Sequence, residues 1–488
     1  MTIALERRLA NFRAHEAARD RGVHPEAGRV GSIWAERLAA EVDGELIRTA
    51  AGAFVRVERT SSVIPIDRER LASLPGQPGA KVPLLCLDTE TTGLTTASGT
   101  LAFLVGLGWW EGARFRQVQL LLPDHVDEPA LLEELRRLIP ASGWLVTYNG
   151  KTFDWPLLVA RYRMARDVPP VHAGHLDLLP VVRRMFRHRM TNAKLQTAET
   201  ELLGMRRHGD VAGWEIPARY LQFLRDGEPA RLIEIVRHND EDVRSLARLL
   251  ALVETGFGDP ESRRQADPGD LAGLARSFGA ERRFEEALDC IDAAMIARDR
   301  APLPVSDRAP LPVDLAPSRE VRTIREETDD WWSPRRRPDF GGRHGRSGSD
   351  GLWRAASPDR LETRWTGPRL VADRARLLRR VGRFADSEAA WIQVADEGGT
   401  LGALAWVEVA KLREHHGRDL DAALTATLAA LRLVERARLI GRGTARVERD
   451  LMRRSSRLRR RIGRRAEARK PDPINHVLRS ESPTAIAS

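Results

Sequence analysis

The stretch from Leu84 to Leu94, LLCLDTETTGL, constrains the fold of this chain more than any other segment. Its apolar first half has the length and composition of a buried β-strand, and Asp88 and Glu90 follow before a Thr/Gly turn. Side chains at positions i and i+2 of a strand point to the same face, so both carboxylates are expected to project together. Neighbouring carboxylates repel each other unless a cation neutralises them. Taken alone, the pattern is more often a strand end with solvated acids.

Two later stretches add acidic residues at the ends of predicted elements. The segment YNGKTFDWPLL starts at Tyr148, and its Asp154 lies where an apolar strand gives way to a helix. An aspartate just before a proline-containing first turn is by itself typical of a helix N-cap. His238 and Asp242 are four residues apart in a segment with helical periodicity, so they share one helix face. Alone, such a pair is more often a surface hydrogen bond than a catalytic couple.

Together the three stretches resemble the exonuclease motifs of the DEDD superfamily, whose members have a ribonuclease H-like fold. That superfamily has a strand D-x-E, then N-x-x-x-F-D, then a helical acid preceded by Tyr or His. The four acids occur here in the same order, as Asp88, Glu90, Asp154 and Asp242. Within the superfamily, residues 84–252 are most similar to the bacterial YprB-like proteins. The matching stretches are Phe103–Leu107, Tyr148–Asp154, His175–Leu178, Ile216–Tyr220 and His238–Val243.

The resemblance implies an α/β fold: a ribonuclease H-like mixed sheet flanked by helices, followed by an α-helical repeat region. It implies a 3′–5′ exonuclease that hydrolyses phosphodiester bonds of single-stranded nucleic acid with two Mg²⁺ or Mn²⁺ ions. By the family pattern Asp88 bridges both ions, Glu90 and Asp242 hold one, and Asp154 holds the other through water. Hard oxygen ligands without cysteine favour these ions over zinc.

The last motif departs from the superfamily pattern. The superfamily has Tyr-x3-Asp or His-x4-Asp, whereas His238 stands at the tyrosine spacing from Asp242. One helical position turns a side chain by about 100°, so the histidine is expected to approach the water from a different angle. An imidazole can accept a proton from water near neutral pH, and we therefore assign His238 as the general base.

Residues next to the motifs are predicted to bind the substrate, namely Thr89, Asn149, Phe153 and Trp155. The two aromatic side chains can stack on terminal bases, although core packing is an equal alternative for Phe153. His175 and Asp177 either add polar contacts near the site or simply begin a helix. The sequence shows no base-reading motif and does not choose between DNA and RNA as the partner.

Two other functions stay open on the sequence alone. The first is a non-catalytic scaffold that binds nucleic acid or protein through a decayed nuclease fold and its helices. Retention of all four acids argues against decay, because clustered carboxylates destabilise a fold that no longer binds metal. The second is an endonuclease or a structure-specific trimming enzyme built on the same site.

Apolar periodicity predicts the elements around these motifs. Three closely spaced strands predict an antiparallel meander: the strand that starts at Leu84 and carries Asp88, then Leu101–Trp110 and Gln117–Leu122. A further strand is expected over Trp144–Asn149, and a hairpin over residues 44–58. Helices are expected over residues 30–42, 128–139, 156–164, 176–186, 194–203 and 231–252.

The chain is predicted to contain several regions. They are a helical and hairpin extension (1–83), the exonuclease domain (84–253), a tetratricopeptide-like helical hairpin (257–297), a disordered basic linker (298–367), further tetratricopeptide-like helices (368–470) and a disordered tail (471–488). The repeat prediction rests on alternating small and large apolar residues, such as Leu271–Phe278 followed by Phe284–Ala294. Ordinary amphipathic helices are the alternative. Such helices are also a candidate surface for a protein partner.

The charge of the chain fits a polyanionic partner. Among its 488 residues the net charge is +10, and only five of its 79 basic residues are lysines. Arginine suits phosphate because its planar guanidinium binds bidentately, although genomic base content is an equal explanation. Two cysteines form no disulfide framework, and no apolar run is long enough to span a membrane. These features predict a cytoplasmic protein without membrane contact.

Overall fold

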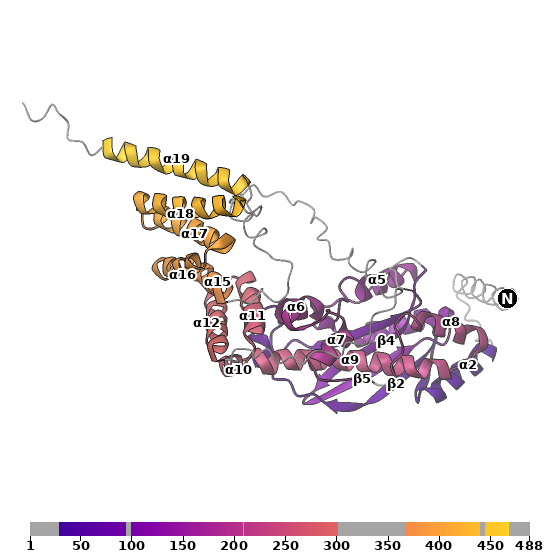
Figure 1. Cartoon of the computed structure of the whole chain (residues 1–488). Coiled ribbons are helices and arrows are strands. Elements are labelled where there is room, and N and C mark those ends of the chain that lie inside the picture. The colour runs from indigo at the N-terminus through magenta and orange to yellow at the C-terminus, as the bar shows by residue number, and fades with distance from the viewer. Residues whose placement is uncertain (1–28, 94–98, 208, 301–366, 440–444, 468–488) are drawn as a thin grey trace, which may run out of the picture. The chain divides into compact units, whose positions relative to one another are not determined.

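The computed structural model describes residues 29–93, 99–207, 209–300, 367–439 and 445–467. The chain separates into two compact units, residues 1–294 and 295–488, and each is described by itself (Figure 1). The predicted tail, nearly all of the predicted linker and the first 28 residues lie outside the described residues.

The first unit is built on a mixed sheet, as predicted. Among the described residues it has seven strands in the order β1-β2-β5-β4-β3-β6-β7. Their bounds are β1 Glu45–Thr49, β2 Gly52–Val63, β3 Leu84–Thr91, β4 Ala102–Glu111, β5 Arg114–Leu121, β6 Trp144–Thr147 and β7 Gly174–Asp177. Strands β3, β4 and β5 form the predicted antiparallel meander, whereas β3–β6 and β6–β7 are parallel.

The predicted hairpin at residues 44–58 is present as β1 and β2, but it is not a separate extension. Strand β2 pairs antiparallel with β5, from Val55 opposite Leu121 to Val63 opposite Arg114. The predicted boundary at residue 83 therefore cuts through the sheet. Alternating apolar residues indicated a hairpin, but alternation does not reveal which distant strand completes its hydrogen bonds.

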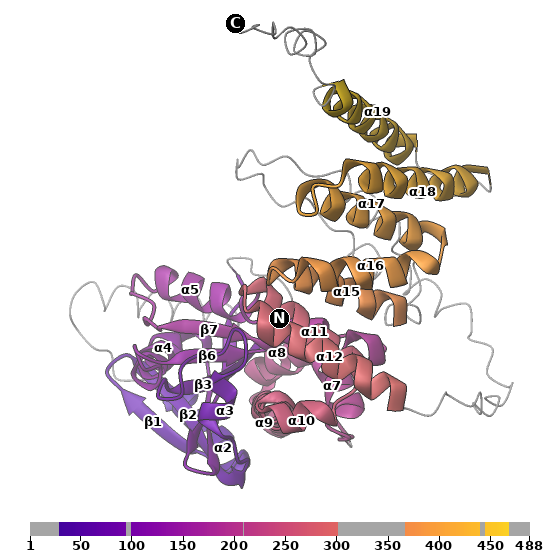
Figure 2. The ribbon, with the colours of Figure 1, turned by 90° about the vertical axis from the view of Figure 1, so that its left-hand side faces the viewer.

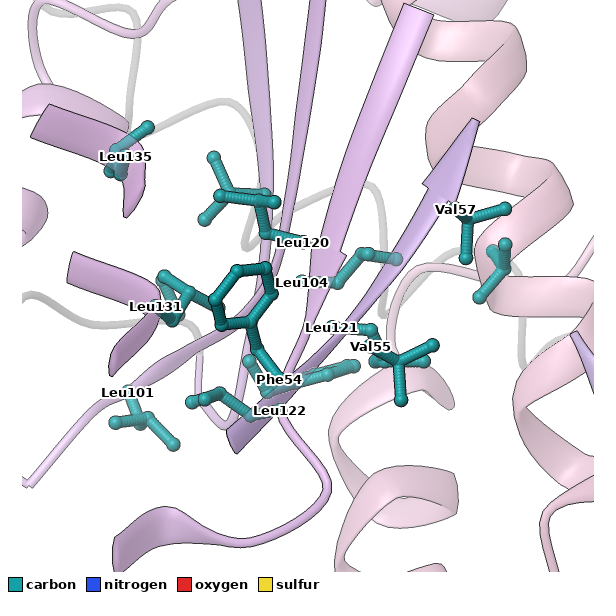
Figure 3. Close-up of a cluster of buried hydrophobic side chains, with 14 of the residues drawn as sticks. Phe54, Val55, Val57, Leu101, Leu104, Leu120, Leu121, Leu122, Leu131 and Leu135 are labelled. Carbon is teal, nitrogen blue, oxygen red and sulfur yellow. The ribbon is translucent and has the colours of Figure 1, made fainter. Parts of the chain in front are cut away.

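Helices cover both faces of this sheet (Figure 2). Helix α9 (Ala230–Phe257) crosses one face over β3, β4 and β5, while α4 (Glu128–Leu138) packs against β2 and β5. On the α4 side the core is apolar, with Phe54, Leu120, Leu131 and Leu135 fully buried (Figure 3). Period-2 alternation along β5 then turns Gln117 and Gln119 to the α9 side.

The remaining helices of the first unit surround these layers. They are α2 Arg29–Glu41, α3 Arg68–Ala72, α5 Asp154–Met164, α6 Leu178–Met185, α7 Leu195–Glu201, α8 Ile216–Asp226, α10 Pro260–Arg264, α11 Pro268–Ala280 and α12 Phe284–Arg300. The helix predicted from residue 176 begins later, because residues 174–177 form the short parallel strand β7. Four residues are too few for periodicity to separate a strand from a helix. Asp177 instead caps α6, its carboxylate accepting from the backbone N–H of Leu179.

Helix α11 packs against α6 within the first unit. The approach is close at Gly273, where an added Cβ would lie 2.4 Å from the carbonyl oxygen of Arg184. Arg189 also forms two hydrogen bonds, of 3.1 and 2.9 Å, with the buried carboxylate of Asp270 at the start of α11. The segment predicted as a separate helical hairpin thus rests on the sheet domain through α11.

The second unit is all helical in its described part. Its helices are α15 Gly367–Arg380, α16 Phe384–Asp396, α17 Gly399–His415, α18 Leu420–Leu439 and α19 Ala445–Glu467, and each packs on the next. Trp391 is fully buried, and the buried Ser387 hydroxyl donates to the carbonyl of Ala375 at 2.7 Å. The tetratricopeptide-like character of these helices stays a prediction. No helix in the described residues is long and apolar enough to cross a membrane.

Candidate metal and catalytic site

The first two acids lie together on β3, as the i, i+2 spacing predicts. Asp88 pairs in register with Gly106 of β4, and Gly106 pairs with Gln119 of β5. These three residues form one row across the sheet on the face that α9 covers. Because the middle residue has no side chain, the row has a gap between the carboxylate and the amide.

Asn239 of α9 fills this gap. Its side-chain nitrogen donates to Asp88 Oδ2 at 2.9 Å, and its side-chain oxygen accepts from Gln119 Nε2 at 2.9 Å. A Cβ at Gly106 would lie 2.2 Å from that oxygen, so the bridge requires glycine there. Neither Asn239 nor Gln119 was assigned a role from the sequence. The signal for Gln119 was that two polar residues, Gln117 and Gln119, alternate with apolar residues near the end of β5.

Asp154 reaches the site from the start of α5. It is the first residue of that helix rather than its N-cap, which is Phe153. Its carboxylate accepts a hydrogen bond from the hydroxyl of Thr89, 2.5 Å away, so this residue positions an acid, and its predicted contact with substrate stays a prediction. Burial raises the pKa of Asp154 to about 6, although the Thr89 hydrogen bond works in the opposite direction.

His238 and Asp242 face β3 together, as the helical spacing predicts. His238 Nε2 lies 3.7 Å from Asp242 Oδ2 and 3.8 Å from Glu90 Oε1. Ligand atoms of these three residues all lie within 4.8 Å of one another. The tyrosine-type spacing therefore brings the imidazole to the acids.

A loop residue that the sequence analysis missed enters the same cluster. Arg207 lies between α7 and α8, and its guanidinium forms ion pairs with Glu199 and Asp242. It also pairs with Asp210 at 3.2 Å. Only 12% of its side chain is exposed, so these contacts are shielded from water. No periodicity or motif distinguishes this arginine from the many others in the chain.

Asp210 fixes the orientation of His238. Its Oδ1 lies 2.7 Å from His238 Nδ1. Burial would raise the pKa of Asp210, but the hydrogen bonds and charges of His238 and Arg207 outweigh it and hold the pKa below its ordinary value. An ionised carboxylate only accepts hydrogen bonds, so Nδ1–H donates in this contact and Nε2 is the ring nitrogen that faces the acids.

The four acids perturb one another electrostatically. Burial raises the pKa of Asp88 well above its ordinary value, and the charges of Asp242, Asp154 and Glu90 raise it further. Burial also raises the pKa of Glu90 well above its ordinary value, and the charges of Asp242, Asp154 and Asp210 raise it further. The charge of Arg207 lowers it in part. A cluster of this kind favours a cation.

Sequence comparison agrees with this architecture. Residues 85–254 match a family model described as the RNase_H superfamily. The domain is RNase H-like. The chain is also 35% identical over 207 residues to a protein of Bacillus subtilis (strain 168) that bears the name "Uncharacterized protein YprB". The match covers 42% of this chain and 50% of the relative, so the chain spans about half of that protein's length.

The donor set of the RNase H-like domain fits a hard divalent cation. Glu90 and Asp242 supply two carboxylates whose ligand atoms lie within 4.8 Å of each other and of the His238 imidazole, and Asp88 and Asp154 add further carboxylates. Oxygen ligands without thiolates suit Mg²⁺ or Mn²⁺. Burial and the neighbouring acids raise the pKa of Glu90 despite the opposing charge of Arg207.

The other predicted substrate residues of the RNase H-like domain differ in their exposure. Phe153 is 37% exposed, whereas Trp155 is partly buried against the core and meets the His172 ring edge-on at 4.6 Å. Asn149 has a positive φ of 68°, and its backbone N–H donates to Asp177 Oδ1 at 2.7 Å. Asp177 thus holds the loop that leads to Asp154. The Nε2 atom of His175 forms a 2.8 Å hydrogen bond with the Thr147 hydroxyl, and burial lowers the pKa of His175 to about 4.

Proposed function

We propose that the RNase H-like domain is a divalent-metal-dependent 3′–5′ exonuclease that hydrolyses phosphodiester bonds of single-stranded nucleic acid. One observation carries the proposal: Asp88, Glu90, Asp154 and Asp242, from three separate elements, converge with raised pKa values for three of the four. A fold keeps such mutual repulsion at a cost in stability unless a cation relieves it. The direction of degradation is supported by the motif set.

The metal ions would be held by the carboxylates of Asp88, Glu90, Asp154 and Asp242. When bound, such ions neutralise phosphate charge and lower the pKa of water. The chain's own residues then orient the reaction. Asn239 fixes Asp88, and Thr89 fixes Asp154. His238 Nε2, which faces Glu90 and Asp242, takes the proton of the attacking water while Asp210 holds Nδ1–H.

End-labelled single-stranded DNA and RNA test this proposal. With Mn²⁺ or Mg²⁺, a 5′-labelled strand should shorten progressively from its 3′ end, and a 3′-terminal block should stop it. Asp88→Asn and Asp242→Asn should abolish the reaction. Glu261→Gln, which removes a carboxylate on α10 that is 70% exposed, serves as the matched control. Wild-type turnover by purified Asp88→Asn protein would refute the assignment.

A non-catalytic scaffold is the second candidate, and one observation favours it. Arg207 already neutralises part of the cluster by pairing with Asp242 and Glu199. A scaffold needs no added cation, whereas the nuclease needs one. Thermal unfolding with and without Mn²⁺ separates the two, because a ligand that binds only the folded state raises the melting temperature. No shift at saturating Mn²⁺, together with no degradation, would favour the scaffold.

A further inference from the structure

The last described helix of the second unit carries its arginines on two distinct faces. Helix α19 has the sequence ARVERDLMRRSSRLRRRIGRRAE, with ten arginines and three acids. It packs on α18 through Leu458 and Ile462, which contact Leu420 and Ala423 (Figures 1 and 2). The arginines next to this apolar stripe and those opposite it have different surroundings.

Three arginines beside the apolar stripe bind one buried acid. Arg454, Arg457 and Arg461 contact the carboxylate of Glu414 on α17 at 2.7, 2.9 and 2.6 Å. The Glu414 side chain is 1% exposed. Burial would raise the pKa of Glu414, but the charges of Arg454, Arg457 and His415 and the Arg457 hydrogen bond outweigh it and hold the pKa below its ordinary value. These three arginines therefore fasten α19 to α17 and are already used.

Five other arginines form a stripe on the outer face, and we call them the α19 stripe. They are Arg446, Arg449, Arg453, Arg460 and Arg464, all exposed. At about 100° per residue they fall within a sector of about 60°, on the side away from Leu458. Within the described residues none of the five makes an ion pair or a hydrogen bond.

The arginine-rich composition does not explain this stripe. Some exposed helix arginines elsewhere are paired with an acid one turn away, such as Arg137 with Glu133 and Arg264 with Glu261. Others, such as Arg225, are exposed and make no ion pair within the described residues. A helix face with like charges at i, i+4 spacing is destabilised rather than stabilised. The stripe is distinguished by gathering five exposed arginines on one face of a single helix, with no counter-charge among the described residues.

We propose that the α19 stripe is a docking surface for the phosphate backbone of nucleic acid. Guanidinium groups bind phosphate oxygens bidentately. A rise of 1.5 Å per residue separates Arg446 from Arg464 by about 27 Å, enough for several consecutive phosphates. The proposal goes beyond hydrolysis at the acidic site, because it needs no metal.

The same geometry argues against a membrane surface. A helix that lies in a bilayer interface inserts an apolar face. The apolar face of α19, with Leu458 and Ile462, is already packed against α18. The stripe thus offers charge without an insertable face, which suits a backbone polyanion.

The test is a salt titration of binding with the full chain in EDTA, so that cleavage does not interfere. The probes are fluorescent oligothymidylate and oligouridylate. Replacing all five stripe arginines by glutamine should lower the slope of log affinity against log salt by about 3.5, since each single-strand phosphate contact contributes about 0.7. Replacing them by lysine should retain most of the slope, because lysine keeps the charge.

A charge-matched control replaces Arg37, Arg116, Arg137, Arg264 and Arg383 by glutamine. These side chains are 45–67% exposed and each pairs with an acid. The control should leave the slope near that of the wild type. Equal slopes for the stripe and control variants would overturn the proposal. Loss of binding to phosphatidylserine vesicles with unchanged nucleic-acid binding would also overturn it.

A smaller variant guards against misfolding. Replacing only Arg446, Arg449 and Arg453 by glutamine leaves the Glu414 contacts intact and should lower the slope by about 2. Failure of the proposed hydrolysis is distinguishable, because it would abolish degradation by the wild type with Mn²⁺ and leave binding in EDTA unchanged. An unchanged slope in a folded triple variant would contradict the docking surface.

Discussion

Asn239 of α9 donates its side-chain amide to Asp88 Oδ2 at 2.9 Å. The contact passes over Gly106, the one residue of the row that has no side chain. The first acid of the site is therefore positioned by a helix that crosses this face of the sheet over β3, β4 and β5. Residues that bind neither metal nor substrate thus set the geometry of the proposed site, and they can be tested separately.

Gln119 and Gln117 form a matched pair for such a test. Both donate to backbone carbonyls of α9, at 2.8 and 2.7 Å, but only Gln119 also donates to Asn239. Gln119→Ala should weaken Mn²⁺ affinity or activity about 10–100-fold, the usual effect of losing an outer-shell partner. Gln117→Ala should lose similar stability, about 1–3 kcal/mol, with unchanged Mn²⁺ dependence. Titration of activity with Mn²⁺ measures both, and equal Mn²⁺ curves would contradict the positioning role.

The pKa of Asp154, raised to about 6, predicts how metal-free stability depends on pH. Between its ordinary value of 3.8 and about 6 the folded protein binds more protons than the unfolded chain. This contribution is present below about pH 4 and is lost as pH rises through 6. Asp154→Asn mimics the protonated form, so it should be more stable than wild type at pH 7.5, by about 1–3 kcal/mol, and equal near pH 4. Denaturant unfolding in EDTA measures the difference.

A carboxylate with the opposite shift provides the control for that measurement. A hydrogen bond from His188 lowers the pKa of Asp267, which caps α11. Its ionised form stabilises the fold, and this contribution is lost as pH falls through the lowered pKa. Asp267→Asn should therefore reduce stability at pH 7.5. If both variants shift stability in the same direction, the electrostatic assignment of Asp154 is wrong.

His238 and Asp210 should affect turnover to different extents. His238→Ala removes the proposed base, so turnover should fall about 10²–10⁴-fold. Asp210→Asn keeps the imidazole but weakens the 2.7 Å contact that holds Nδ1–H, so its loss should be smaller and its pH–rate profile altered. Single-turnover rates from pH 5 to 9 measure both. If the His238→Ala variant turned over at the wild-type rate, His238 would have only a structural role.

Arg207 should make the protein less dependent on metal for its stability. Arg207→Gln leaves Asp242 and Glu199 buried without their cation, which typically costs about 3–5 kcal/mol. Added Mn²⁺ should restore part of that loss, so the rise in melting temperature should exceed that of the wild type. Arg219→Gln, which removes a more exposed pair with Glu215 and Glu234, should show the wild-type Mn²⁺ response. Equal responses in the two variants would show that Arg207 and metal act independently.

Local patterns predicted the sheet meander and the two local pairs of site residues, whereas the convergence of the three acidic stretches was implied by the family resemblance. Asp88 and Glu90 were placed by strand alternation, and His238 with Asp242 by helical spacing, both of which depend only on neighbours in sequence. Strand β7 and the pairing of β2 with β5 were not predicted, because pairing between distant strands depends on tertiary contacts.

The cations of the chain show the same limit. In sequence, Arg454 and Arg460 are members of one basic run. In the structure Arg454 binds the buried Glu414, whereas Arg460 faces outward. Arg207 likewise belongs to no pattern, yet it enters the acidic cluster. The sequence shows where the arginines lie along the chain. Only the packed structure separates the arginines that stabilise the fold from those that stay exposed to a partner.

Gly106 gives a way to sort the relatives of this protein. Its missing Cβ is what admits Asn239, so any side chain at this position and an asparagine at 239 should exclude each other during divergence. A lineage that loses the proposed hydrolysis is free to fill that gap, and it can do so while all four acids are still present. Replacement of the glycine on β4 would then mark the loss of this activity earlier than replacement of the carboxylates themselves.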